Sequence, residues 1–469
     1  MMKNKAMRCV WLVCGLLMLA VTSCKDDLLY TDGEPIPEGE TTIIAQVDFR
    51  PLVEGLAGKS RTAGDAIKSI QDLCVLLYDT EGNFVEGHSL ESISNANPTD
   101  GQFYVNEVTR KDGDAPDGGT IAETKTPQAN LKLTIPYGRY YIYAVANMGE
   151  DFKKAVQAHG KENGAAEEVA KYKTAIATKE GLKSISLTWD VADVAKNSQM
   201  FGHFTIVGQE NNSELITINK KGMKLHSWIR RAASKVTIAY DGSKLEEGVF
   251  IYLKSVTIKD IPQNCCLGQD NPAVPENYQP KDRDEGVKLD LIKNGETIKY
   301  YEGDTEPTIS DFKETYEARI TKGKPLFGSK EQGENAYHPK KLADVHTEIT
   351  NALYFYENMQ GKGKEGTPSD KRQVVANTLN KTEPTYPNGG QENNEAWKDA
   401  KPYGTYIEVD AFYVSINDKK VGRGPIKYRF MLGKDVITDY NAERNHHYKL
   451  TLKFKGYAND ADWHIEYEE

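Results

Sequence analysis

Cys24 is the residue whose position in this chain best suits covalent chemistry. It directly follows Val21, Thr22 and Ser23, at the end of an uncharged apolar run. Small side chains at this point fit a peptidase pocket, and the Cys24 thiol is the nucleophile there that can carry a thioether-linked lipid. The pattern predicts cleavage between Ser23 and Cys24 and a lipid on Cys24.

The residues before Cys24 predict an export signal. Basic residues lie within the first eight positions and precede an apolar run from Val10 to Val21. This run is shorter than the roughly 20 apolar residues that a membrane-spanning helix needs, so a signal peptide over residues 1–23 is favoured over a permanent anchor. An ordinary secretory signal, in which Cys24 is incidental, is the alternative.

Residues 24–40 predict a flexible tether. The segment begins with Lys25-Asp26-Asp27 and is rich in acidic residues, proline and glycine. Such a composition cannot build an apolar core, so it spaces a folded body from the membrane. Because a lipidated cysteine of this kind carries several acyl chains, the uncut precursor is expected to be held stably.

The segment Gly58–Asp65 places Arg61 among small residues, after a predicted strand from Thr42 to Val53. A flexible loop of this kind can be drawn into the cleft of a trypsin-like protease, which cuts after arginine or lysine. The pattern predicts a cut between Arg61 and Thr62. The alternative is an ordinary exposed loop, which the local composition alone slightly favours.

Other patterns that could support chemistry are incomplete. The nine histidines form no His-Glu-x-x-His motif, and the adjacent His446 and His447 would point in different directions. Asp112, Asp114 and Asp117 lack the further ligands of a calcium loop, so a polar hairpin loop is favoured. No Gly-x-Ser-x-Gly elbow occurs, and no pair of carboxylates stands out. We therefore expect no enzyme activity, no metal and no cofactor.

Composition and cysteine content limit the partners and the covalent links. A net charge of −10 and a mean hydropathy of −0.61 indicate a well-solvated chain and argue against nucleic acid, which needs a basic surface. Beyond Cys24, the mature chain keeps Cys74, Cys265 and Cys266. Neighbouring cysteines rarely bridge each other. We favour buried free thiols, with a bridge from Cys74 to one of the pair as the alternative.

Short runs of β-branched and aromatic residues predict a mainly β chain. The clearest strands are Thr42–Phe49, Leu73–Tyr78, Asn130–Ile135, Tyr140–Ala146, Ser184–Trp189, Val236–Tyr240, Phe250–Ile258, Asn351–Glu357, Tyr403–Ile416, Ile426–Leu432 and Tyr448–Lys455. Asp151–Lys183 is rich in Ala, Lys and Glu and predicts one or two helices inserted in the first domain. The polar region Gln269–Thr350 is expected to be rich in loops.

The chain is long enough for more than one core, and two domains are expected. A new series of strands begins near Leu225, which places the first domain at residues 41–225 and the second, with a C-terminal strand, at residues 226–469. Residues 41–61 form the first strand and the cleavage loop. Tandem β-sandwich-like domains with Greek-key character fit the strand pattern better than α/β alternation.

The order of these features resembles the fimbrillin-type lipoproteins that form or cap type V pili in the Bacteroidales. Lys25-Asp26-Asp27 resembles the surface-export signals of lipoproteins in that group, and the residues before Cys24 resemble the lipobox of bacterial lipoproteins. Further stretches that resemble these proteins are Ser60–Thr62, Ile70–Asp79, Trp228–Val236, Ile261–Gly268, Tyr356–Gly361 and Tyr440–Tyr448.

The resemblance implies a structural or adhesive subunit of a cell-surface pilus (fimbrium) at the outer membrane, built from two transthyretin-like domains. In such proteins an arginine-specific protease releases the first strand, and a strand from another pilin subunit fills the groove. Here Thr42–Val53 would be the released strand and Arg61 the cut site. The donor would come from the carboxyl end, at Tyr448–Lys455 or Trp463–Tyr467. A host or bacterial surface ligand is a further implied partner.

One alternative is a surface lipoprotein that binds or processes glycans. Sugar platforms generally combine exposed aromatic faces with paired acids, whereas the tryptophans outside the signal, Trp189, Trp228, Trp397 and Trp463, form no cluster in the sequence. Only Gly456–Glu469 follows the last firm strand, which leaves stalk, tip and anchor subunits open.

Overall fold

The computed structural model describes residues 35–49, 72–86, 90–94, 128–157, 166–190, 198–209, 213–246, 248–273, 289–299, 326–328, 352–366, 370–374, 404–458 and 460–468. These residues form a mainly β protein with several sheets, which confirms the fold class expected from the sequence. In the described part of the chain, no helix has the length and apolar character needed to span a membrane.

The first sheet gathers the strands of the amino-terminal half in the order β3-β2-β5-β7-β9-β1-β4, with β8 paired to β5. These strands are β1 (Glu40–Phe49), β2 (Asp72–Tyr78), β3 (Leu90–Ser94), β4 (Gln128–Pro136), β5 (Gly138–Ala146), β7 (Met200–Ile206), β8 (Leu215–Ile218) and β9 (Lys224–Arg231). Its inner face packs into one core that includes Ile43, Leu77, Leu133 and Ile229.

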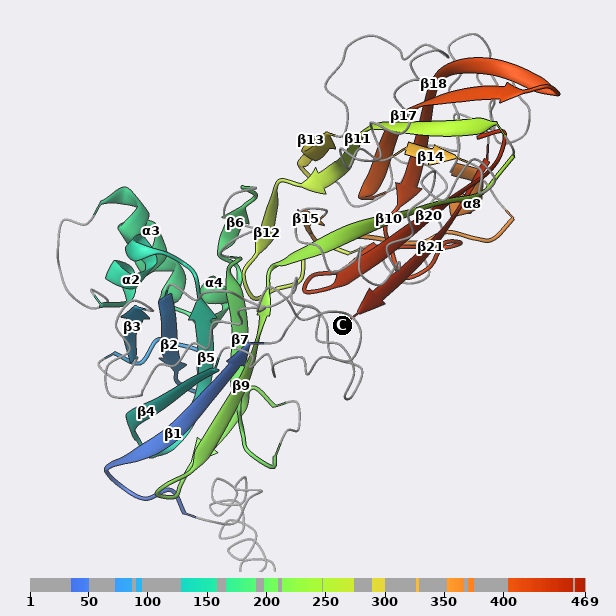
Figure 1. Ribbon diagram of the computed structural model, residues 1–469. Coiled ribbons are helices and arrows are strands. Elements are labelled where there is room, and N and C mark those ends of the chain that lie inside the picture. The colour runs from blue at the N-terminus through green and yellow to red at the C-terminus, as the bar shows by residue number, and fades with distance from the viewer. Residues whose placement is uncertain are drawn as a thin grey trace, which may run out of the picture.

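Helices cover the other face of β2 and β5, as Figure 1 shows. They are α2 (Glu150–Gln157), α3 (Glu167–Ile176) and α4 (Lys179–Lys183). The helical insertion is therefore confirmed, with three described helices where one or two were expected. A second core packs Phe152, Ile176 and Leu182 of these helices against Leu76 and Val145 of the strands. This covering explains why all seven residues of β2 are buried, instead of every second one.

The carboxyl-terminal half contributes two further sheets, in the orders β15-β10-β20-β21 and β13-β11-β17-β18, with β14 paired to β11. Their strands are β10 (Ala233–Leu245), β11 (Val249–Pro262), β13 (Leu291–Lys299), β14 (Leu326–Gly328), β15 (Ala352–Tyr356), β17 (Tyr406–Asn417), β18 (Lys420–Met431), β20 (His447–Gly456) and β21 (Asp460–Glu468). One core joins the sheets, with Ile238 and Leu450 from the first and Ile251 and Tyr428 from the second.

The chain itself and a pair of short strands are among the links between the halves. Strand β9 continues through Ala232 into β10, and β12 (Asn264–Cys266) pairs with β6 (Ser186–Thr188) of the first half. A short sheet of β16 (Asn358–Lys362) and β19 (Asp439–Ala442) lies in the second half, which also contains α8 (Lys371–Val374). In Figure 1 the β9–β10 segment runs between the two groups of sheets. The domain boundary expected between residues 225 and 226 falls inside β9.

Candidate functional site

Strand β1 lies inside the first sheet, between two strands from distant parts of the sequence (Figure 1). It pairs antiparallel with β4, from Glu40↔Pro136 to Asp48↔Gln128. It pairs parallel with β9, from Ile44↔Lys224 to Phe49↔Ile229. The predicted first strand is therefore an integral part of the sheet, with ladders on both of its edges.

Alternate side chains of β1 point into the core. Ile43, Ala45 and Val47 are fully buried, whereas Ile44 on the opposite face is 44% exposed. This period of two is what the alternating sequence predicts for a strand with one solvated face. The core around these residues includes Leu131 and Leu133 of β4 and Leu225 of β9. Loss of β1 would therefore uncover both apolar surface and two backbone ladders.

Strand β4 depends on β1 for its place in the sheet. Among the described strands, β1 is the one that pairs with β4. The chain then passes through Tyr137 into β5, on the far side of β7 and β9 in the sheet order. We call the space between β4 and β9 that β1 fills the β1 slot.

The covalent sites predicted from the sequence lie outside the described residues. These are Ser23 and Cys24 at the predicted signal cleavage, and Arg61 and Thr62 at the predicted protease site. Asp112, Asp114 and Asp117 also lie there. The described chain stops at Phe49 and resumes at Asp72, so β1 directly precedes the segment that contains Arg61.

The two strands expected to supply a donor are both paired within their own half of the chain. Strand β20 lies between β10, to which it is parallel, and β21, to which it is antiparallel. Its position therefore repeats that of β1, which is parallel to β9 and antiparallel to β4. Strand β21 is at the edge of its sheet and pairs with β20.

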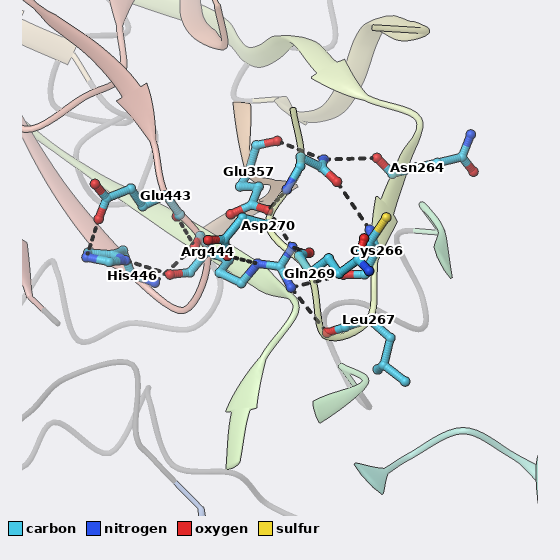
Figure 2. Close-up of polar contacts among 11 residues, drawn as sticks. Asn264, Cys266, Leu267, Gln269, Asp270, Glu357, Glu443, Arg444 and His446 are labelled. Carbon is cyan, nitrogen blue, oxygen red and sulfur yellow. Dashed lines mark hydrogen bonds and ion pairs between the residues drawn. The ribbon is translucent and has the colours of Figure 1, made fainter. Parts of the chain in front are cut away.

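Arg444 makes several polar contacts to loops near the junction of the two halves, drawn in Figure 2. Its guanidinium donates to the carbonyl oxygens of Cys266 at 2.9 Å, Leu267 at 3.2 Å and Gln269 at 2.7 Å. It also forms a short ion pair with the buried carboxylate of Glu357. Burial lowers the pKa of Arg444, but the Glu357 carboxylate outweighs burial and raises it.

Asn271 completes this cluster, which we call the Arg444 clamp. Its backbone N–H donates to Glu357, its side-chain amide donates to the carbonyl of Asn264 at 3.2 Å, and its side-chain oxygen accepts from the N–H of Cys266 at 3.2 Å. The clamp fixes the loop after β12, the strand that pairs with β6. Arg444 and Glu357 were not predictable as partners from the sequence, because no local pattern brings residues so far apart in the chain together.

The cysteines and the paired histidines have structural surroundings. Among the described residues, Cys74, Cys265 and Cys266 form no disulfide, as favoured from the sequence, and Cys266 is only half-buried. His447 forms a hydrogen bond with Thr237 at 2.7 Å, whereas His446 lies 3.3 Å from the Glu443 carboxylate. In the described part of the chain, no group of three or more His, Cys, Asp or Glu side chains is placed to hold a metal ion.

Comparisons with known proteins give one short family match and several distant structural ones. Residues 353–452 match a family described as a domain of unknown function, DUF4906. No curated protein matches the chain.

Among solved structures, the chain is similar to a candidate cell adhesion protein from Parabacteroides distasonis, at 9% identity, a TM-score of 0.44, and coverage of 92% of this chain and 97% of that one. It is similar to the tip fimbrial protein Mfa3 from Porphyromonas gingivalis, at 10% identity, a TM-score of 0.35, and coverage of 92% and 98%. A fimbrilin from the same organism matches at 11% identity and a TM-score of 0.36, with coverage of 89% and 91%.

These neighbours are fimbrial and candidate adhesion proteins of the bacterial group to which the sequence motifs pointed. Because the TM-scores lie below 0.5, we base the function on the strand arrangement and the sequence motifs of this chain.

Proposed function

We propose that this chain is a structural or adhesive subunit of a cell-surface pilus, exported as a lipoprotein and assembled by protease-triggered strand addition. The observation that carries this proposal is the position of β1. The strand comes first in the described chain, fills the slot between β4 and β9, and directly precedes the segment that contains Arg61.

Strand addition follows from what the departure of β1 would leave behind. The facing edges of β4 and β9 would lose their ladder partners, and the pockets of Ile43, Ala45 and Val47 would open to water. Unpaired strand edges bind extended segments through backbone hydrogen bonds, and apolar pockets select alternate side chains. A strand from another subunit satisfies both needs together and joins the two subunits.

Export as a lipoprotein gives the precursor its place at the cell surface. The predicted lipid on Cys24 and the tether to residue 40 lie on the same side of Arg61 as β1. A cut after Arg61 therefore breaks the covalent link of both the anchor and β1 to the rest of the subunit. Strand β1, still held by its two ladders, then leaves when another strand displaces it. In this proposal the lipid serves transit of the precursor to the outer membrane, and the cut subunit passes to the pilus.

The proposal is tested by incubating the purified precursor with an arginine-specific protease. We expect a new amino terminus at Thr62 and a ladder of heat-resistant oligomers on a denaturing gel. The Arg61→Gln variant should stay uncut at this site and monomeric. Arg50→Gln is the matched control, because it removes a nearby arginine and should leave the ladder unchanged.

Two results would contradict the proposal. One is an undiminished ladder from the Arg61→Gln variant. The other is filament-derived protein that still begins at Cys24.

A further inference from the structure

The β1 slot contains two buried hydroxyl groups without hydrogen-bond partners in the part of the chain that the structure describes. One belongs to Thr41 of β1, which is 3% exposed, and the other to Ser227 of β9, which is 1% exposed. A buried hydroxyl loses its bonds to water, and without a partner it regains nothing. Each of these unpaired hydroxyl groups therefore weakens the binding of β1 in the slot.

The two hydroxyls lie at different levels of the slot. Thr41 is aligned with Ile135 of β4, whereas Ser227 is aligned with Val47 of β1. The resident strand thus offers a hydroxyl where its neighbour is apolar, and an aliphatic side chain where its neighbour is a hydroxyl. A strand with an aliphatic residue at the level of Thr41 and a hydroxyl residue at the level of Val47 would match its neighbours at both levels.

Aligned hydroxyl residues do bond across neighbouring strands in this protein. Thr42 and Thr134 are aligned, with hydroxyl oxygens 3.3 Å apart, and the aligned Thr257 and Thr297 are 2.9 Å apart. Both of these pairs are antiparallel, whereas Val47 and Ser227 are aligned across the parallel β1–β9 ladder. A threonine at the level of Val47 would still bring a second hydroxyl to the buried position beside Ser227.

A third level restricts size. Ala45 is fully buried and aligned with Leu131 on one side and Leu225 on the other, both of which are buried. A large side chain at this level would have to displace packed leucines, and overpacking a core is destabilising. The slot therefore accepts a small residue here.

We propose that the β1 slot selects its replacing strand by three side chains: an aliphatic residue at the level of Thr41, a small residue at the level of Ala45 and a hydroxyl residue at the level of Val47. The strand runs parallel to β9 and antiparallel to β4, as β1 does. This inference rests on the proposed strand addition and extends it to the identity of the partner.

The described carboxyl-terminal strands do not carry this order of residues. The core-facing alternation of β20 is Tyr448, Leu450, Leu452 and Phe454, and the apolar alternation of β21 is Ala461, Trp463, Ile465 and Tyr467. Neither places a small residue two positions before a serine or threonine. The rule therefore disfavours β20 and β21 of a second copy as the partner and favours a strand that carries the three residue types.

The resident strand is tested first, in the uncut chain, by urea unfolding. Thr41→Val should raise the folding equilibrium constant roughly tenfold, because it removes a buried hydroxyl and keeps the shape. Thr42→Val is the matched control, with an exposed hydroxyl, and should give no gain. Val47→Thr should be tolerated beside Ser227 but destabilise the Ser227→Ala variant, where its own hydroxyl would lack a partner. Loss of stability in Thr41→Val would overturn the inference.

Partner selection is tested on chain cut after Arg61, with synthetic peptides and native mass spectrometry. Three peptides are compared: residues 37–49, the same peptide with Thr41→Val and Val47→Thr, and residues 460–468. The altered peptide should displace the resident strand at a concentration at least about tenfold below that of the unaltered one. The carboxyl-terminal peptide should not displace it.

The outcomes distinguish a failure of the selection rule from a failure of strand addition. Equal displacement by the first two peptides, or strongest displacement by residues 460–468, would overturn the selection rule while leaving strand addition intact. If none of the peptides enters the slot of the cut chain, strand addition itself fails. The urea series on the uncut chain still decides whether the hydroxyls weaken β1.

Discussion

Lys371 shows how a single buried charge links stability to pH. Its side chain is fully buried, and its ammonium group donates to the main-chain carbonyl oxygens of Asp435 and Asp439, the latter at 2.8 Å. Burial lowers the pKa of Lys371 from 10.5 to about 7, against the attraction of the Asp435 and Asp439 carboxylates. The charged form is thus costly in the folded chain and free of this cost in the unfolded chain.

The sign of the pH effect follows from that pKa. Between about pH 7 and 10.5 the unfolded chain binds a proton at Lys371 that the folded chain lacks. The free energy of unfolding therefore increases as the pH rises through this range, by at most about 1.4 kcal/mol per pH unit. Lys371→Met removes this gain. Urea unfolding at several pH values should show the difference between wild type and variant shifting in favour of the wild type as pH rises above 7. A difference that does not change with pH would contradict the prediction.

Cys24 gives a prediction that depends on one sulfur atom. Cells that express the precursor and take up labelled palmitate should label it, and Cys24→Ala should abolish the label and move the protein from the membrane to the soluble fraction. Cys266→Ala is the matched control, because it removes a half-buried thiol from the folded body. Full labelling of Cys24→Ala would exclude Cys24 as the lipid site.

At the scale of elements, β4 should report on the state of β1. Ile43→Asp buries a charge in the core and should loosen β1, with a loss of stability of several kcal/mol, whereas Ile44→Asp alters a half-exposed side chain and should be tolerated. Because β1 is the strand that pairs with β4 in the described sheet, hydrogen exchange of the β4 amides should accelerate in Ile43→Asp. Unchanged exchange in β4 would contradict this dependence.

A helix or strand could be predicted from the sequence where the pattern that specifies it lies within one short segment. Strands β1, β4 and β20 were predictable from their alternating residues. The helices were predictable from a segment rich in Ala, Lys and Glu. Each of these patterns lies within one segment of the sequence. Strand β13 was not predicted, because it lies in a polar region that was expected to be rich in loops. Its residues are mostly half-exposed or exposed, so its two faces show little contrast in polarity. The place of β1 between β4 and β9 was not predictable, because both partners are distant in the sequence.

At the scale of the molecule, the Arg444 clamp should contribute to holding the two halves together. Arg444→Met would leave the buried Glu357 carboxylate without its ion-pair partner, at a cost of roughly 3 kcal/mol in the free energy of unfolding. Glu357→Gln in the same chain should recover part of this loss. The exposed Arg230 provides a control through Arg230→Met. Equal effects of the two arginine variants in urea unfolding would contradict a role for the clamp.

The slot between β4 and β9 has a mechanical consequence for any strand that occupies it. A strand with ladders on both edges, when pulled along its own axis, loads all of its hydrogen bonds in shear at the same time. A strand peeled sideways from one end breaks them in succession and yields at a lower force. If neighbouring subunits are joined through this slot by a strand that runs along the filament axis, tension on the filament loads the joint in shear, the direction in which it is strongest.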